Sequence, residues 1–123
     1  MDVNTALLLL VLFMTKHLFA DYFLQTRMML SNRGVYFHPG RGLHCLIHVV
    51  GSWIAMALVG VPLGLTIVIL IAEWLAHYHI DFAKGRWSEM KDHGPEDAGY
   101  WRAFGTDQLL HQLTYVLMVW AVV

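Results

Sequence analysis

The hydrophobic positions of this chain fall into four long segments, each of them apolar at one end and polar at the other. Residues 4–30 open with a continuous apolar run over 6–14, and residues 43–61 finish with one. Residues 62–84 again begin apolar, whereas residues 107–123 begin polar and end apolar. Each segment has about 17 to 27 residues, close to the roughly 20 that an α-helix needs to cross a hydrocarbon core. The pattern therefore predicts four membrane-spanning helices.

A soluble helical bundle is the alternative, and two observations disfavour it. A soluble helix keeps a polar face along its whole length, whereas these segments have almost solidly apolar ends. Hydrophobic residues make up 58% of the chain and the mean hydropathy is +0.53, above the roughly 45–50% apolar content of soluble domains. We predict an all-α membrane protein in which residues 1–123 form one domain, a four-helix transmembrane up-down-up-down bundle.

The connections between the segments are predicted from their polar residues and from glycine and proline. Residues 31–42 are expected to form a loop with a turn at Pro39-Gly40. Gly60 and Pro62 mark a short turn, with the proline at the first position of the next helix. Residues 85–106 mix both charge signs and are expected to form a long hydrophilic loop.

Charge and cysteine content exclude two classes of function. The formal net charge is −1, so the chain lacks the basic surface of a nucleic-acid-binding protein. Cys45 is the single cysteine, which excludes an internal disulfide and a cysteine-rich zinc site. We expect Cys45 to be a small buried apolar residue, off the face that its histidine neighbours share.

Each segment also carries a pair of potential metal ligands four residues apart. Residues at this spacing share one helix face. The pairs are His17/Asp21, His44/His48, His77/Asp81 and Asp107/His111. In an up-down bundle the polar ends of all four segments lie together, which predicts that the pairs meet just inside one membrane face. Of the eight residues, His17 lies deepest, roughly 15 Å along the helix from Arg27.

The chemistry of these eight side chains indicates a dinuclear metal site. Five imidazoles and three carboxylates suit divalent transition metals, with zinc as the preferred ion and iron or manganese as alternatives. Eight ligands are too many for one ion and suit two ions bridged by an aspartate. Paired ions activate water for hydrolysis of phosphoesters, phosphoanhydrides or amides.

Neighbouring residues are predicted to assist the site. Asp21 and Glu73 are candidates for the general base, and Lys84, three residues after Asp81, for binding an anionic substrate group. Gln25 and Gln108 are candidates for orienting the ligands.

Each pair also has a purely structural interpretation. Asp107 could cap the start of a helix. His17 and Asp21 could simply hydrogen-bond to each other, and the His44/His48 pair could be packed in the core. The remaining histidines, 38, 79 and 93, are predicted to lie off the site.

Basic residues gather at the polar ends of the segments and in their loops. These are Arg27, Arg33, Arg41, Lys84, Arg86, Lys91 and Arg102. The opposite end has no Lys or Arg. By the positive-inside rule the site is expected on the cytoplasmic side, with both termini outside.

The ligand motifs resemble a family known as domain-of-unknown-function family 3307. The string His17-x-x-x-Asp21-x-x-x-Gln25 resembles its HxxxDxxxQ signature, and the later pairs are similar to its remaining motifs in the same order. That bacterial and phage family in turn resembles predicted membrane-bound metal-dependent hydrolases. The resemblance implies a multi-pass protein of the bacterial inner membrane. The acidic stretch Glu96-Asp97, in the long loop, has no counterpart in the family pattern.

We therefore favour a membrane-embedded dinuclear-metal hydrolase acting near the cytoplasmic leaflet on a phosphate- or amide-bearing substrate. Membrane lipid is the expected environment, and a lipid-linked compound or a nucleotide is the expected substrate. A homo-oligomer is a candidate assembly. The alternatives are a His-rich di-iron oxidase, a metal or proton transporter, and a non-enzymatic structural membrane protein.

Overall fold

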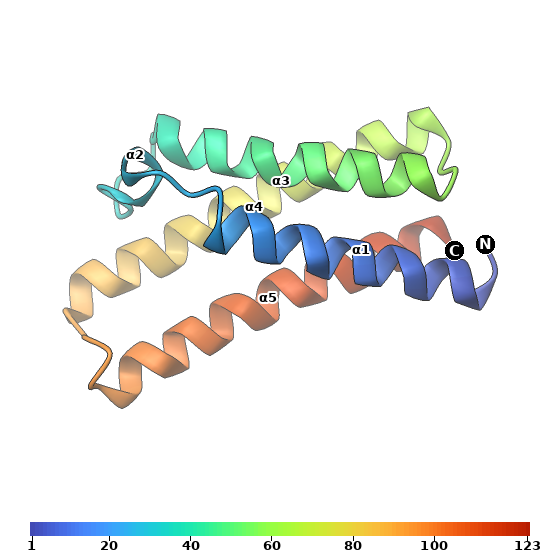
Figure 1. The fold of residues 1–123 in the computed structure, drawn as a ribbon. Coiled ribbons are helices and arrows are strands. Elements are labelled where there is room, and N and C mark those ends of the chain that lie inside the picture. The colour runs from blue at the N-terminus through green and yellow to red at the C-terminus, as the bar shows by residue number, and fades with distance from the viewer.

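The computed structural model describes residues 1–123 as five helices and no strands, which confirms the all-α prediction. The four long helices are α1 (Val3–Tyr22), α3 (Pro39–Leu58), α4 (Leu63–Lys91) and α5 (Ala98–Val122). The short helix α2 (Arg27–Leu30) lies in the connection between α1 and α3. The long helices run alternately up and down, so that both termini lie at one end of the molecule (Figure 1).

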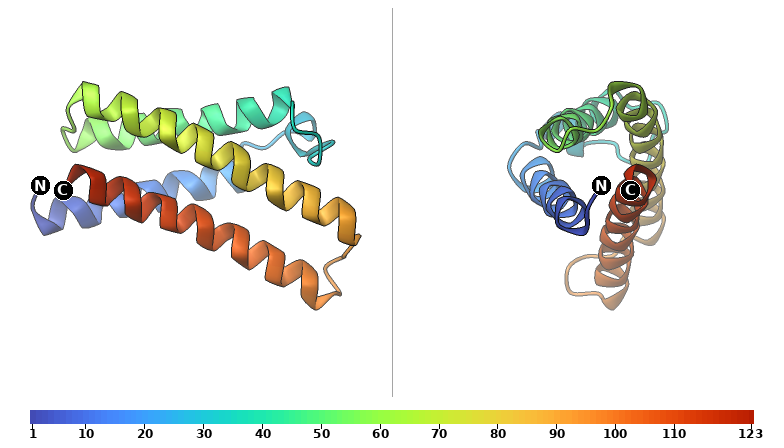
Figure 2. Two further views of the ribbon diagram at one scale, coloured as in Figure 1. Left: turned by 180° about the vertical axis from the view of Figure 1, so that it is seen from behind. Right: turned by 90° about the vertical axis from the view of Figure 1, so that its right-hand side faces the viewer.

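The long helices are arranged as a ring in which each contacts two others. The contacting pairs are α1 with α3, α3 with α4, α4 with α5, and α5 with α1. The end-on view on the right of Figure 2 shows this arrangement, and the side view on the left shows α4 and α5 extending beyond the loop end of α1. The ring encloses a single axis along which side chains of all four helices can meet.

Three of the helices are long and apolar enough to cross a membrane, namely α1, α3 and α4. The helix α5 is not among them, because polar residues such as Asp107, Gln108 and His111 occupy the middle of its sequence. The outward surface of the bundle is nevertheless apolar along α5 as well, since Leu117 is 62% exposed and Trp120 77% exposed.

The apolar core lies in the half of the bundle that contains the termini. It consists of Leu9, Phe13, Ala55, Met56, Ile69, Tyr115 and Met118. The rings of Phe13 and Tyr115 pack with their centroids 5.7 Å apart. In lipid, close packing of this kind and hydrogen bonds between helices hold helices together, because lipid tails are as apolar as the core itself.

The first helix is shorter than predicted. Residues 4–30 were expected to form one helix, but α1 ends at Tyr22 and the chain bends before Thr26 caps α2. The amide N–H groups of Phe23 and Leu24 both donate to the carbonyl of Phe19, so the regular ladder stops there. The prediction was wrong because the apolar pattern continues through this bend.

The helix α4 is longer than predicted. It continues through Gly85, where a loop was expected, and ends at Lys91, followed by the cap residue Asp92 in a left-handed conformation with φ 51°. Gly85 is required here for close packing: a Cβ atom would lie 2.4 Å from the carbonyl oxygen of Arg33. The connection to α5 is short, since α5 begins at Ala98.

Three other local interpretations of the sequence also differ from the structure. Pro39 and Gly40 form the first turn of α3 and not a loop turn, and a Cβ on Gly40 would lie 2.6 Å from the Met28 carbonyl oxygen. Asp107 does not cap a helix, because it lies well inside α5 and is buried. Pro62 precedes α4 as its N-cap, one residue before the predicted position.

A buried arginine holds the segment between α2 and α3. The Arg41 guanidinium donates to the carbonyl oxygens of Val35 at 2.8 Å and Tyr36 at 2.9 Å, and also to that of Arg33. The same group lies over the Tyr78 ring of α4, 5.0 Å from its centroid. This loop is therefore fixed against the end of the bundle where the polar residues lie.

Candidate metal centre

The four ligand pairs meet on the inner faces of the four long helices. Each pair belongs to one helix and faces the bundle axis, in the half of the bundle away from the termini. Seven of the eight residues are buried, and the side chain of Asp21 is 13% exposed. The convergence expected from the up-down arrangement is therefore present in the structure.

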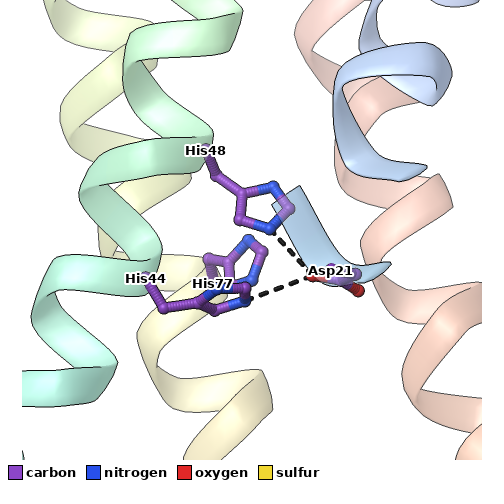
Figure 3. A group of neighbouring side chains, drawn as sticks. All are labelled: Asp21, His44, His48 and His77. Atoms are coloured by element: carbon purple, nitrogen blue, oxygen red, sulfur yellow. Dashed lines mark hydrogen bonds and ion pairs between the residues drawn. The ribbon is translucent and has the colours of Figure 1, made fainter. Parts of the chain in front are cut away.

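One group of ligand atoms joins α1, α3 and α4. Asp21 Oδ1 lies 2.9 Å from His48 Nε2 and 3.2 Å from His44 Nε2 (Figure 3). With a ring nitrogen of His77, these atoms all lie within 4.8 Å of one another. Three imidazoles and one carboxylate at such separations could hold a divalent transition metal such as zinc or iron.

A second group joins α4 and α5. Asp81 Oδ1 lies 3.0 Å from His111 Nε2, which in turn lies 3.6 Å from Asp107 Oδ1. Ligand atoms of these three residues again lie within 4.8 Å of one another. All three side chains are buried, so the group combines two carboxylates and one imidazole with little access to bulk water.

Asp81 connects the two groups. While its Oδ1 faces His111, its Oδ2 lies 3.2 Å from His77 Nε2 and 3.6 Å from His44 Nε2. The two carboxylate oxygens therefore point to different halves of the cluster. This is the placement required of a carboxylate that bridges two cations.

Cys45 lies closer to the cluster than its position on the helix predicted. It is fully buried, and its sulfur, a ring nitrogen of His77 and a carboxylate oxygen of Asp81 lie within 4.8 Å of one another. A thiol at this position adds a soft donor to an otherwise nitrogen and oxygen set.

His17 differs from the other four histidines of the pairs. Its Nδ1 lies 2.8 Å from the Tyr115 hydroxyl, and its Nε2 lies 3.0 Å from Asp21 Oδ2 and 3.1 Å from Gln108 Oε1. Both ring nitrogens thus have protein partners. The structure places His17 beside the cluster, where it orients Asp21.

Several buried polar atoms of the cluster lack hydrogen bonds. They include His77 Nε2, Asp81 Oδ2 and Asp107 Oδ1, all of which face other ligand atoms, and His44 Nδ1. Leaving a buried polar atom unpaired costs about 1–3 kcal/mol. His77 Nε2 and Asp81 Oδ2 are close together but not aligned for a hydrogen bond, as expected for lone pairs directed at a shared cation.

An ion pair supports the cluster from the apolar side. Lys16 Nζ lies 2.5 Å from Glu73 Oε1, 3.2 Å from His48 Nδ1 and 3.2 Å from the His48 carbonyl oxygen. Ser52 Oγ donates to the same Glu73 oxygen at 2.9 Å. Glu73 therefore contacts Lys16 and Ser52, and reaches the ligand residues only through Lys16.

Lys16, Ser52 and Tyr115 belong to this site and were not predicted from the sequence. Two of them follow a ligand by four residues: Ser52 follows His48, and Tyr115 follows His111. On α3 and α5 the polar face therefore continues one turn deeper than the ligand pair. Lys16 lies off the face of the α1 pair, and only the tertiary structure brings it to Glu73.

Carboxylates outnumber the ammonium groups that contact them in and around the cluster. The four carboxylates belong to Asp21, Glu73, Asp81 and Asp107, and the two ammonium groups to Lys16 and Lys84. The Arg33 guanidinium lines the adjoining cavity. A buried cluster rich in carboxylates and imidazoles is a setting that could hold a divalent cation.

A small cavity leads from the cluster to the loop end of the bundle. It has a volume of about 120 Å³ and is lined by Asp21, His44, Asp81 and Asp107 together with Gln25, Arg33 and Lys84. Lys84 Nζ lies 3.6 Å from Asp107 Oδ2. The cavity therefore has ligand carboxylates at its base and cationic side chains at its wall.

The remaining histidines serve structural roles away from the cluster. His38 caps α3, accepting the Arg41 amide at 2.8 Å through Nδ1. His79 lies 2.9 Å from the Tyr36 hydroxyl, and His93 packs against Gly99. Gln108, expected to orient ligands, donates to Asp107 Oδ2 at 3.2 Å and lies beside His17.

The fold and the cluster define an all-α protein with candidate membrane spans and buried His/Asp groups able to bind metal. The chain belongs to the family described as protein of unknown function (DUF3307), whose pattern matches residues 9–123. No curated protein and no solved structure matches the chain.

Proposed function

We propose that this protein is a four-span membrane protein with a dinuclear metal site that acts as a hydrolase. The observation that carries the proposal is the position of Asp81 between two groups of ligand atoms. One group is Asp21, His44, His48 and His77, and the other is Asp107 and His111. The first group offers four ligands, and the second offers three when Asp81 is counted with it, which suits one ion apiece.

Pairs of divalent ions about 3.5–4 Å apart lower the pKa of a bound water and stabilise both the attacking and the leaving oxygen in hydrolysis. Residues of this chain would complete such a reaction. Arg33 and Lys84 line the cavity above the ligands and would bind the anionic group of a substrate. Asp21, oriented by His17, is the candidate to accept a proton, because one edge of its carboxylate reaches the cavity.

The membrane arrangement follows from the surface of the helices. The helix α5 is 25 residues long and has apolar residues exposed along its terminal half, so it is proposed as the fourth span beside α1, α3 and α4. The positive-inside rule places the end with the basic residues, and with it the metal centre, on the cytoplasmic side. Both termini then lie outside, in a bacterial inner membrane.

An apolar barrier disfavours the alternative of a metal or proton transporter. On the side of the cluster facing the termini, the bundle interior consists of Leu9, Phe13, Met56 and Ile69 with Met118. Beyond the Lys16–Glu73 pair and Thr66 this region has no buried polar side chain to continue a pathway. A substrate that enters from the basic end and leaves at the same end fits the structure better.

The decisive experiment is metal analysis of the protein purified in detergent without chelator. Elemental analysis should find close to two ions per chain, and anomalous scattering should place them on either side of Asp81. Asp81→Asn should lose metal, whereas His79→Gln, which removes an imidazole outside the cluster, should retain it. Absence of tightly bound metal in the wild-type protein would refute the proposal.

The reaction is then tested with the metal-loaded protein. Phosphomonoester, phosphoanhydride and amide substrates are compared, and release of product should require metal and Lys84. If the ions are iron and the visible spectrum changes with oxygen while no hydrolysis occurs, the His-rich di-iron oxidase is the better assignment. Metal without any turnover would indicate a structural metal-binding protein.

A further inference from the structure

A second and larger cavity lies between the ends of α4 and α5 that extend past the loop end of α1. Its volume is about 580 Å³, within the range of roughly 300–1,000 Å³ typical of small-molecule sites. All of its lining residues belong to α4, to α5 or to the connection between them. This groove therefore differs from the small cavity, which α1 and α3 also help to line, although the two adjoin at shared residues.

The groove changes character along its length. Near the middle of the helices it is lined by Ile80, Ala83 and Leu110, and toward the loop by Lys91 and Arg102. Leu110 is 43% exposed, so the apolar end is open to the surroundings of the bundle. Trp87, 46% exposed, lies between the two regions with Lys91 over its ring at 4.9 Å. An apolar end, an interfacial tryptophan and a basic end follow the polarity profile of a lipid monolayer.

The basic end of the groove has cations without carboxylate partners. Neither Lys91 of α4 nor Arg102 of α5 forms an ion pair. The exposed Arg86 of α4, in contrast, has its Nη1 atom 3.9 Å from Glu89 Oε2. His93 also lines this end, and its ring occupies the space that a side chain at position 99 would fill. The charge of the groove is thus complementary to an anionic headgroup.

The groove meets the metal centre at two residues. Lys84 and Asp107 line both the groove and the small cavity. Asp107 Oδ1, a candidate ligand atom, is buried and unpaired, and Lys84 Nζ lies beside the other oxygen of the same carboxylate. A headgroup in the groove would therefore have its phosphate next to the ligands of the second ion.

We propose that this groove binds an anionic phospholipid-type amphiphile, with its chains toward Ile80 and Leu110 and its phosphate at Lys84, Lys91 and Arg102. The proposal rests on the proposed function, for which it names the substrate class as a membrane lipid that bears a phosphate headgroup. The lipid enters sideways from the leaflet between α4 and α5. A nucleotide, which has no apolar chain, would leave the Ile80–Leu110 end of the groove empty.

The test is a binding measurement on the full-length protein, made by native mass spectrometry in detergent. The probes are dioctanoyl phosphatidic acid, dioctanoyl phosphatidylcholine, inorganic phosphate and AMP. Phosphatidic acid should bind one per chain and more tightly than the other three. Arg102→Gln should weaken it about tenfold or more, as expected for loss of a charge-assisted contact. Arg86→Gln, an equal change of charge outside the groove, should alter it less than twofold.

Three outcomes would overturn the proposal. Equal weakening by Arg102→Gln and Arg86→Gln would indicate general attraction to basic surface. Binding of phosphate or AMP as tight as that of phosphatidic acid would indicate a soluble substrate, and no saturable binding of any probe would remove the site. If Arg102→Gln unfolds by circular dichroism, Lys91→Gln replaces it with the same expectation.

Metal content measured in the same samples separates this proposal from the hydrolase. Lipid binding that depends on Arg102 in a protein without metal would refute the hydrolase and leave the lipid site. A protein with two ions and no lipid site would refute the groove assignment alone.

Discussion

The buried ion pair beneath His48 allows a quantitative test of how the cluster is held. Lys16 and Glu73 lie 2.5 Å apart with side chains 11% and 1% exposed. Removing either partner leaves the other charge buried without compensation, which typically costs about 3–5 kcal/mol. Removing both charges while keeping similar volumes is often nearly neutral. We therefore expect a strongly non-additive pair of substitutions.

The variants are Lys16→Met, Glu73→Gln and the double variant. Glutamine still offers Ser52 an acceptor, so the double variant removes both charges and keeps this hydrogen bond. Each single variant should lower the free energy of unfolding by about 3–5 kcal/mol, and the double variant by about 1 kcal/mol. Unfolding is followed by circular dichroism during titration with SDS in mixed micelles. Lys91→Met, the same change at an exposed site, should have little effect.

Metal affinity provides a second measurement, which separates an orienting role of Lys16 from its effect on the stability of the fold. Lys16 contacts His48 at both its Nδ1 and its carbonyl oxygen, so it fixes the ring that presents Nε2 to the cluster. Loss of such an orienting partner typically costs 10- to 100-fold in metal affinity, as a rough range. The stable double variant should therefore still bind metal more weakly. Additive stability losses, or an unchanged metal affinity in the double variant, would refute this account of the pair.

Four further outcomes follow from the structure. Chelation of metal should lower the apparent melting temperature and readdition of zinc should restore it, because an ion that binds only the folded protein stabilises it. No change would contradict a structural contribution of metal. Asp81→Asn should reduce bound metal by at least one ion per chain, measured by elemental analysis. Gly85→Ala should destabilise the fold by about 1–3 kcal/mol, measured by the same SDS titration, because its Cβ would overlap the Arg33 carbonyl. Asp2 caps the start of α1 by accepting the Thr5 amide, and this hydrogen bond lowers the pKa of the Asp2 carboxyl below its ordinary 3.8. The first turn of α1 should therefore be ordered above pH 3.8 and lose order as the pH falls through the lowered pKa of Asp2. NMR titration of the Thr5 amide checks this, and D2N should abolish the transition.

The positions of the helices could be predicted where the apolar runs are long. They could not be predicted where tertiary packing determines the end of a helix. The centres of α1, α3 and α4 follow from hydrophobicity alone. The end of α4 does not, because Gly85 usually indicates a turn and serves here to let the Arg33 backbone approach. The sequence pattern carries no record of that contact, so the loop prediction failed.

The same distinction applies to the candidate site. The pairs could be found because a spacing of four residues fixes a shared helix face, and the alternating direction of the spans then brings the faces together. The roles within the site depend on which nitrogen faces which oxygen. For example, His17 contacts Tyr115, which lies 98 residues away in the sequence, and Lys16 contacts His48, which lies 32 residues away. No local sequence pattern reveals such contacts.

The distribution of one ligand pair to each long helix has a consequence for biosynthesis. Chains emerge from the N-terminus, so α1, α3 and α4 are made before α5. Before Asp107 and His111 are made, the second group of ligand atoms consists of Asp81 alone, which also faces the first group. If the proposed metal centre forms, its full occupancy has to wait for the last helix, and a loaded centre would then report that the whole chain has been made and assembled.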